Sequence, residues 1–178
     1  MWHTLTMIFP YVIAYTIPLL LASLGGLYSE RSGVVNLGLE GLMLVGCFAA
    51  ALVIHSLQGV VPLTLLISIG LLAAVAAGIL CSLLHAFASI TLKADQIISG
   101  TAINMLATAV TVYAARSILG SGNIRAYSII RKDIPILSNI PILGKLLFSQ
   151  SYWSTWLVLL ILALSWLLLY KTSFGLRL

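Results

Sequence analysis

The sequence predicts an all-α fold: a polytopic bundle of about five transmembrane helices, with a sixth left open. Of 178 residues, 61% are apolar and 7% are charged, whereas about a quarter of the residues in a soluble domain carry charge. Residues 8–28 and 41–92 contain no Asp, Glu, Lys or Arg. Runs of this length are sufficient for a helix to cross the hydrocarbon core. We therefore interpret the chain as an integral membrane protein whose spans are helical, because a helix satisfies its own backbone in lipid.

Five apolar segments are expected to form the spans: residues 8–27, 39–56, 61–91, 96–119 and 152–170. The first segment lacks the basic start of a signal peptide and is too long for its apolar core, which predicts a retained span. Pro10, Pro18 and Pro62 mark kinks or starts of helices. Gly25-Gly26 offers a point where the first helix would end early or break, which leaves the span count uncertain by one.

The third and fifth segments are expected to face different surroundings. Small residues recur at every fourth position of the third segment, which allows close helix approach in lipid and predicts a buried helix. They are Gly70, Ala74, Gly78, Ser82 and Ala86. The fifth segment is nearly all Leu, Val and Ile between interfacial Trp and Tyr residues, so we expect a peripheral, lipid-exposed helix.

A long polar stretch, residues 120–151, lies between the fourth and fifth segments. It contains Arg125, Arg131 and Lys132, and two Ile-Pro-Ile-Leu sequences that begin at Ile134 and Ile140. These prolines cannot continue a helix. Charge does not orient the chain, because five basic residues fall on the side of this loop and four on the side of the C-terminal tail.

The polar cluster of residues 28–41 is the first functional candidate. An ionisable side chain near the bilayer centre costs about 2.5 to 3.5 kcal/mol and usually faces a bundle interior or a water-filled route. Asn36 and Glu40 are four residues apart and would share one helix face. Gly33, Gly38 and Gly41 would permit close backbone approach or an unwound turn. Helix packing and lining of a pathway remain equally open for this face.

The other polar residues have ordinary interpretations. Glu30 and Arg31 fit a loop at the membrane surface. Asp95 is expected to cap the helix that follows it. Asn104 is expected to form an interhelical hydrogen bond and is also kept as a candidate for pathway lining.

Nothing in the sequence points to enzymatic or metal chemistry. His55 and His85 stand alone on apolar faces, and Cys47 and Cys81 lie inside apolar runs as small hydrophobic residues. No metal-ligand spacing, nucleophile with its base, or phosphate-binding loop is present in the sequence. We expect no cofactor, no metal and no intrinsic catalysis. The formal charge of +5 is usual for a polytopic membrane protein and does not indicate nucleic-acid binding.

Three blocks of sequence resemble the permease subunits of bacterial ABC importers for nucleosides and simple sugars, relatives of the ribose and branched-chain amino-acid permeases. The blocks are PLLLASLGGLYSERSGVVNLGLEGLMLVG at 18–46, ADQIISGTAINMLA at 94–107 and YKTSFGLRL at 170–178. The sequence IPILG at 140–144 also fits the family, so the resemblance covers essentially the whole chain. The short N-terminus resembles the shorter of the two permeases in systems that use a pair.

The resemblance implies a type II importer in the bacterial plasma membrane. Two permease subunits would form the pathway, a cytoplasmic ATPase would drive it, and an external binding protein or lipoprotein would deliver the substrate. Residues 120–151 would be an external loop, and residues 171–178 would start the cytoplasmic coupling region. The residues expected near the ATPase are Lys171, Thr172, Phe174, Gly175 and Arg177.

Further helices follow this point in the resembling family, so residues 1–178 are expected to be the N-terminal part of a permease domain that does not transport alone. Two other functions remain open. One is a non-transporting remnant that associates with an intact permease. The other is an ion-coupled carrier that uses Glu40, although the sequence lacks the inverted hydropathy repeats of such carriers.

Overall fold

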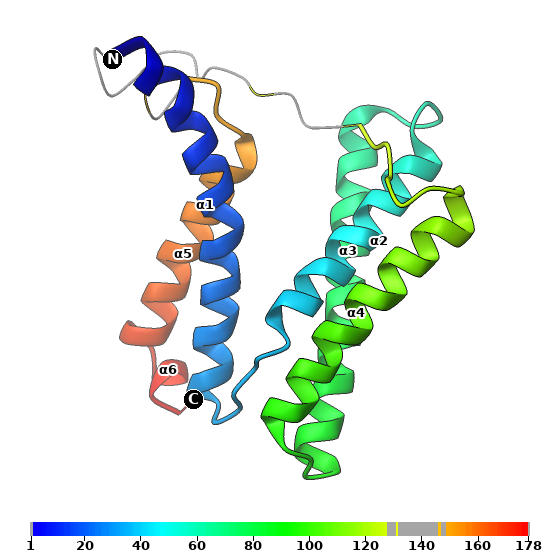
Figure 1. The fold of residues 1–178 in the computed structure, drawn as a ribbon. Helices are drawn as coiled ribbons and strands as arrows, with labels where there is room; N and C mark the ends of the chain where they lie inside the picture. The colour runs from blue at the N-terminus through cyan, green and yellow to red at the C-terminus, as the bar shows by residue number, and fades with distance from the viewer. Residues whose placement is uncertain (1, 128–130, 132–145, 147–148, 178) are drawn as a thin grey trace. The chain divides into compact units, whose positions relative to one another are not determined.

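The elements of the described chain are helices. The structure is a computed structural model, and it describes residues 2–127, 131, 146 and 149–177. The helices are α1 (Trp2–Arg31), α2 (Leu39–Leu57), α3 (Leu63–Ala86), α4 (Gln96–Leu119), α5 (Trp153–Lys171) and the short α6 (Ser173–Arg177) (Figure 1). A π-helical turn, η1 (Phe87–Thr91), continues α3.

Five helices of the described residues are long and apolar enough to cross a membrane. They cover Thr4–Arg31, Leu39–Leu57, Leu63–Thr91, Gln96–Leu119 and Trp153–Lys171. This confirms the predicted all-α polytopic fold, and each span begins and ends within a few residues of its expected limits. The agreement arises because lipid leaves a chain few ways to pair its backbone other than a continuous helix.

The first helix is longer than expected. α1 runs unbroken through Pro10, Pro18 and the Gly25-Gly26 pair, so the predicted early end or break is wrong. Glu30 and Arg31 form its last turn instead of a surface loop. A glycine within a helix costs about 0.5 to 1 kcal/mol, whereas an unpaired backbone group in hydrocarbon costs several. The continuous helix is therefore the less costly solution.

The chain forms two compact units, residues 1–27 with 129–178 and residues 28–128. In the first unit, the Arg131 Cζ atom lies 4.0 Å from the ring centroid of Tyr11 in α1. The same atom lies 4.9 Å from the ring centroid of Tyr152, the residue before α5. Such cation–π contacts hold a residue of the polar loop against both rings. A hydrogen bond with Tyr152 raises the pKa of the Arg131 guanidinium.

The rest of that loop is largely outside the described residues. This applies to Lys132, Lys145 and both Ile-Pro-Ile-Leu sequences. Within α5, Val158 and Leu169 are buried, while Leu160 and Leu164 are exposed. Large exposed apolar side chains also occur on α1, α3 and α4. Exposure thus does not single out α5, and its lipid-facing position stays a prediction.

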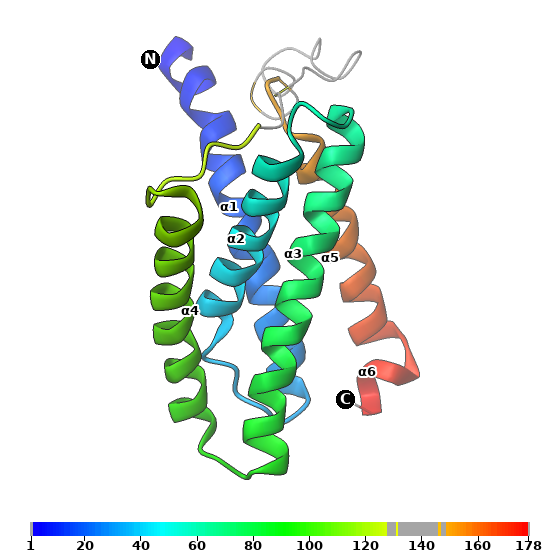
Figure 2. The same cartoon turned by 90° about the vertical axis from the view of Figure 1, so that its right-hand side faces the viewer.

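The second unit contains α2, α3 and α4. α2 packs against both of the others (Figures 1 and 2). A Cβ atom added at Gly70 of α3 would lie 2.8 Å from Ile54 Cγ1 of α2. A Cβ atom added at Gly46 of α2 would lie 3.3 Å from the carbonyl oxygen of Ala74. The first part of the predicted small-residue stripe therefore forms a close helix contact, as such residues allow in lipid.

The second part of the stripe behaves differently. A Cβ atom added at Gly78 would meet no atom of the described residues within 4 Å. The Ser82 hydroxyl donates to the carbonyl oxygen of Ile79 in its own helix, at 2.8 Å, and Ala86 ends α3. The described contacts therefore give no support for a close helix contact at Gly78.

Candidate functional site

A non-helical segment, residues 32–38, separates α1 from α2. Gly33 has a φ of +82°, a left-handed conformation that glycine adopts at little cost. α2 begins at Leu39, and its N-cap residue, Gly38, has no side chain with which to cap the helix. The first N–H groups of a helix have no partners within it, so the start of α2 depends on groups from elsewhere.

Two polar side chains of α4 bond this region: Gln96 holds the segment before the helix, and Asn104 bonds one N–H group of the first turn of α2. The Val35 N–H donates to Gln96 Oε1 at 2.7 Å. The Gly41 N–H donates to Asn104 Oδ1 at 2.7 Å, and Asn104 Nδ2 donates to the Leu37 carbonyl oxygen at 2.9 Å. The Asn104 amide thus takes the place of the missing side-chain cap. It confirms the predicted interhelical hydrogen bond.

The hydrogen bonds fix the non-helical segment beside the first part of α4, from Gln96 to Asn104. Gln96 and Asn104 are eight residues apart, roughly 12 Å along a helix axis. α2 accordingly begins well above the lower ends of α3 and α4 (Figures 1 and 2). Irregular backbone at membrane depth occurs only where protein buries it or where it lines a water-filled cavity. The segment is therefore a candidate part of a polar route.

Glycines let the segment lie directly against α4. A Cβ atom added at Gly100 would lie 2.9 Å from the Gly38 nitrogen and 3.0 Å from Leu37 Cβ. One added at Gly41 would lie 2.8 Å from Asn104 Oδ1 and 3.0 Å from Asn104 Cα. The predicted close backbone approach is confirmed at Gly38 and Gly41.

The shared helix face predicted for Asn36 and Glu40 is wrong. Asn36 lies before α2, half-buried, and its Oδ1 accepts the Gly38 N–H at 3.0 Å. A short amide side chain readily forms such a local bond in place of a helical turn. Glu40 lies in the first turn of α2 and is exposed. Its carboxylate lies near the positive end of that helix.

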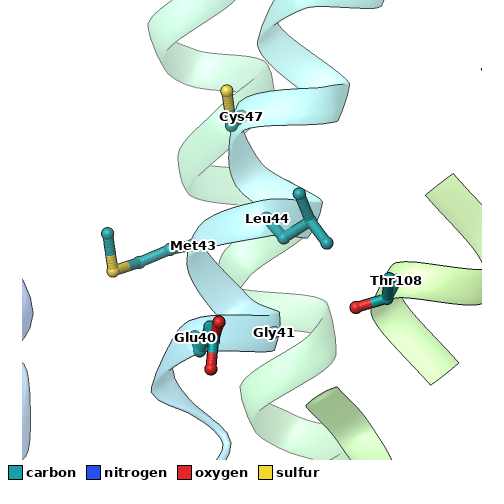
Figure 3. A pocket seen from close by; sticks show the side chains of 6 residues that line it. All are labelled: Glu40, Gly41, Met43, Leu44, Cys47 and Thr108. Carbon is teal, nitrogen blue, oxygen red and sulfur yellow. The ribbon is translucent and has the colours of Figure 1, made fainter. Parts of the chain in front are cut away.

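Glu40 borders a groove between α2 and α4. One part has a volume of about 300 Å³ and is lined by Glu40, Gly41, Met43, Leu44, Cys47 and Thr108 (Figure 3). The adjoining part, of about 450 Å³, is lined by Glu40, Asn104, Met105, Thr108 and Ala109. The two parts share Glu40 and Thr108, and the hydroxyl oxygen of Thr108 points toward α2 (Figure 3). We call these residues together the α2–α4 groove.

Sequence reasoning missed several residues of this site. Gln96, Gly100, Asn104 and Thr108 follow one another at intervals of four, so they share one face of α4. That face meets the non-helical segment through Gln96, Gly100 and Asn104 and the groove through Asn104 and Thr108. The spacing was visible in the sequence, but only Asn104 was singled out.

The remaining predicted residues lie outside the groove. Asp95 Oδ1 accepts the N–H groups of Ile97 and Ile98 at 2.8 and 3.2 Å, which confirms the predicted cap. His85 is buried, with Nδ1 3.0 Å from Ser99 Oγ. His55 Nδ1 lies 2.7 Å from the Arg125 carbonyl oxygen. The sequence predicts that both histidines stand alone, but each has a polar partner. The described residues contain no group of side chains that could hold a metal ion.

The residues expected near an ATPase lie at the end of α5 and in α6. Lys171 Nζ lies 5.9 Å from the Trp166 ring centroid. The Thr172 hydroxyl donates to the Leu168 carbonyl oxygen at 2.6 Å. Gly175 packs against the backbone of Leu169, and Phe174 is exposed. The Arg177 side chain is outside the described residues, and the role of this tail stays a prediction.

Comparison with known proteins gives the chain a family context. Residues 8–178 match the model of a family described as branched-chain amino acid transport system / permease component. A guanosine ABC transporter permease from Bacillus subtilis is 44% identical over 97% of this chain and 54% of its own length. A nucleoside ABC transporter permease from Lactococcus lactis is 39% identical over 99% of this chain and 56% of its own length.

A more distant relative is a putative glucose ABC transporter permease from Haloferax volcanii, 35% identical over 89% of this chain and 46% of its own length. The chain spans about half the length of the curated relatives that it matches. No solved structure matches it.

Proposed function

Because the chain belongs to the family of branched-chain amino acid transport system permease components, we propose that it forms part of the translocation pathway of an ATP-driven importer for nucleosides. Support for the substrate class comes from the printed names of the two relatives at 44% and 39% identity, a guanosine and a nucleoside permease. The relative named for glucose is less similar, at 35%. Related simple sugars are the alternative substrates.

The interrupted start of α2 is the observation that carries the proposal. Secondary transporters commonly place substrate beside broken helices, where unwound backbone and helix ends offer polar groups within the membrane, and the same arrangement suits an ATP-driven importer. Here the break is held by Gln96 and Asn104, and Glu40 borders the groove beside it. A carboxylate at such a position is costly in lipid unless it faces a polar route. Asn36, by contrast, supports the segment by bonding the Gly38 N–H.

ATP hydrolysis would take place in a separate subunit, because the family and the two nucleoside relatives are described as permease components of transport systems. The other expected components are a second permease subunit and an external binding protein or lipoprotein. The assembly would lie in the bacterial plasma membrane. Residues 120–151 would face outside, and the end of α5 with α6 would approach the ATPase.

Uptake of radiolabelled guanosine tests the proposal. The assembled transporter would contain the natural polypeptide that includes these residues, together with its ATPase, its partner permease and its binding protein. We expect ATP-dependent uptake, and we expect Glu40→Gln to reduce it while leaving the amount of protein in the membrane unchanged. Glu30→Gln is the matched control, because Glu30 is also exposed but lies at the end of α1 outside the groove. Normal uptake with both Glu40→Ala and Asn36→Ala would contradict a pathway role for this segment.

A further inference from the structure

The side chains of the α2–α4 groove offer mainly hydrogen-bond acceptors. The Thr108 hydroxyl donates to the Asn104 carbonyl oxygen at 2.9 Å, which leaves its oxygen lone pairs for a ligand. The Asn104 amide is engaged through Oδ1 with Gly41 and through Nδ2 with Leu37, so a single N–H of that amide remains. An ionised Glu40 can only accept. A matching ligand therefore offers hydrogen-bond donors such as hydroxyl groups, and an anionic group is disfavoured.

We propose that Glu40 is the specificity-determining residue of this groove, accepting hydrogen bonds from the 2′- and 3′-hydroxyls of a ribonucleoside and repelling nucleotides. The inference rests on the proposed function and names the ribose hydroxyls as the part of the substrate that the groove recognises. Two adjacent hydroxyls can each donate to the carboxylate, and hydrogen bonds to a charged acceptor are among the stronger ones. A phosphate group offers only acceptors and negative charge, so it gains no such bond.

The position of Glu40 in its helix adds to this discrimination. The N-terminus of a helix attracts anions, because its free N–H groups and dipole favour negative charge. Glu40 lies in the first turn of α2, so its own charge offsets that attraction. Replacement by glutamine would remove the offset. The same end of the helix would then favour a phosphate.

The apolar residues of the groove suit the other half of a nucleoside. Met43, Leu44 and Met105 are groove residues together with Glu40 and Thr108. Thioether groups form favourable contacts with aromatic rings and adapt to rings of different size. A nucleobase therefore has an apolar surface available, which a bare metal cation would not use.

Cys47 provides a reporter that does not depend on transport. It is a free, exposed cysteine that lines the same groove as Glu40. In the assembled transporter with Cys81→Ala and no other reactive cysteine, we would measure the rate at which a membrane-permeant maleimide alkylates Cys47. The probes are guanosine, 2′-deoxyguanosine and guanosine 5′-monophosphate.

We expect guanosine to slow the alkylation and the 5′-monophosphate to leave it unchanged. The half-protecting concentration of 2′-deoxyguanosine should be about tenfold higher than that of guanosine, the factor that one hydrogen bond to a charged group contributes. In Glu40→Gln, the difference between guanosine and 2′-deoxyguanosine should shrink, because a neutral amide oxygen accepts a weaker hydrogen bond than a carboxylate. The monophosphate should begin to protect. Glu30→Gln should keep the original pattern.

Equal protection of Cys47 by all three compounds, or protection by none of them, would overturn the inference. The same relative protection in Glu40→Gln as with Glu40 present would also overturn it. Protection by Na⁺ or Mg²⁺ alone to the same extent as by guanosine would also overturn it and indicate a cation site. Each of these results leaves the proposed function standing if the unmodified transporter takes up guanosine. Failure of that uptake would instead overturn the proposed function.

Discussion

Asn104 completes the first turn of α2 from a neighbouring helix, since its Oδ1 accepts the Gly41 N–H at 2.7 Å although the two residues are 63 positions apart. An N-cap side chain of the helix itself often makes this bond, and Gly38 has no such side chain. The start of α2 is therefore formed correctly only when α4 is in place. The two helices depend on each other through one amide group.

Replacing Asn104 with leucine should lower the stability of the transporter. The change leaves the buried Gly41 N–H without its partner, and an unpaired buried group costs about 1 to 3 kcal/mol. The Leu37 carbonyl is exposed, so water can replace its lost bond. Thermal unfolding in detergent would measure the loss as a lower Tm.

Thr101→Ala is the control for this change, because the Thr101 hydroxyl bonds only the carbonyls of Ile97 and Ile98 in its own helix. Equal values of Tm for the two variants would show that the Asn104 bonds contribute nothing to stability.

Two glycines should respond in opposite ways to replacement by alanine. At Gly100 the added Cβ would lie 2.9 Å from the Gly38 nitrogen, closer than such contacts allow, so Gly100→Ala should destabilise the protein and reduce uptake. At Gly78 the Cβ would meet no described atom within 4 Å. Alanine favours a helix over glycine by about 1 kcal/mol, so Gly78→Ala should be neutral or stabilising. Denaturation midpoints of the two variants check this order, and a larger loss at Gly78 would reverse it.

The positions of the spans could be predicted from the sequence because they depend on local properties. Length and apolar content decide whether a segment crosses lipid, and the cap at Asp95 involves N–H groups two and three residues away. The continuity of α1 through Gly25-Gly26 was missed because the cost of a glycine is small beside that of an unpaired backbone in lipid.

The hydrogen bonds that hold the break before α2, and the place of Asn36 outside the helix, could not be predicted in the same way. The interval between Asn36 and Glu40 fits a helix, and the sequence of the segment does not exclude one. The structure breaks there because Gln96 and Asn104, more than sixty residues later, provide bonds for Val35, Leu37 and Gly41. A contact between distant residues thus overrides the local spacing.

Asp95 should affect α4 and leave substrate selection unchanged. Its Oδ1 accepts two N–H groups at the start of α4, and loss of such a cap costs about 0.5 to 2 kcal/mol. Asp95→Ala should therefore lower Tm, whereas Asp95→Asn should have a smaller effect because asparagine caps almost as well. The order of Cys47 protection by the three guanosine compounds should stay the same in both. A changed order would place Asp95 within the recognition site.

The end of α4 and the end of α5 should lie on opposite sides of the membrane. Ser121 follows α4 and Ser173 begins α6, and both are exposed. Among the described residues between them, α5 is the one helix of spanning length. The resemblance to importer permeases predicts that Ser121 lies outside and Ser173 in the cytoplasm. The variants Ser121→Cys and Ser173→Cys, in a background with Cys47→Ala and Cys81→Ala, would be treated with a membrane-impermeant thiol reagent.

In intact cells the reagent should label the cysteine at position 121 and spare the one at position 173. After the cells are permeabilised, both cysteines should react, which shows that each is accessible from its own side. Labelling of position 173 alone in intact cells would reverse the orientation and place α6 away from any cytoplasmic ATPase. Labelling of both in intact cells would mean that the chain does not cross the membrane an odd number of times between them, and the span assigned to α5 would then be wrong.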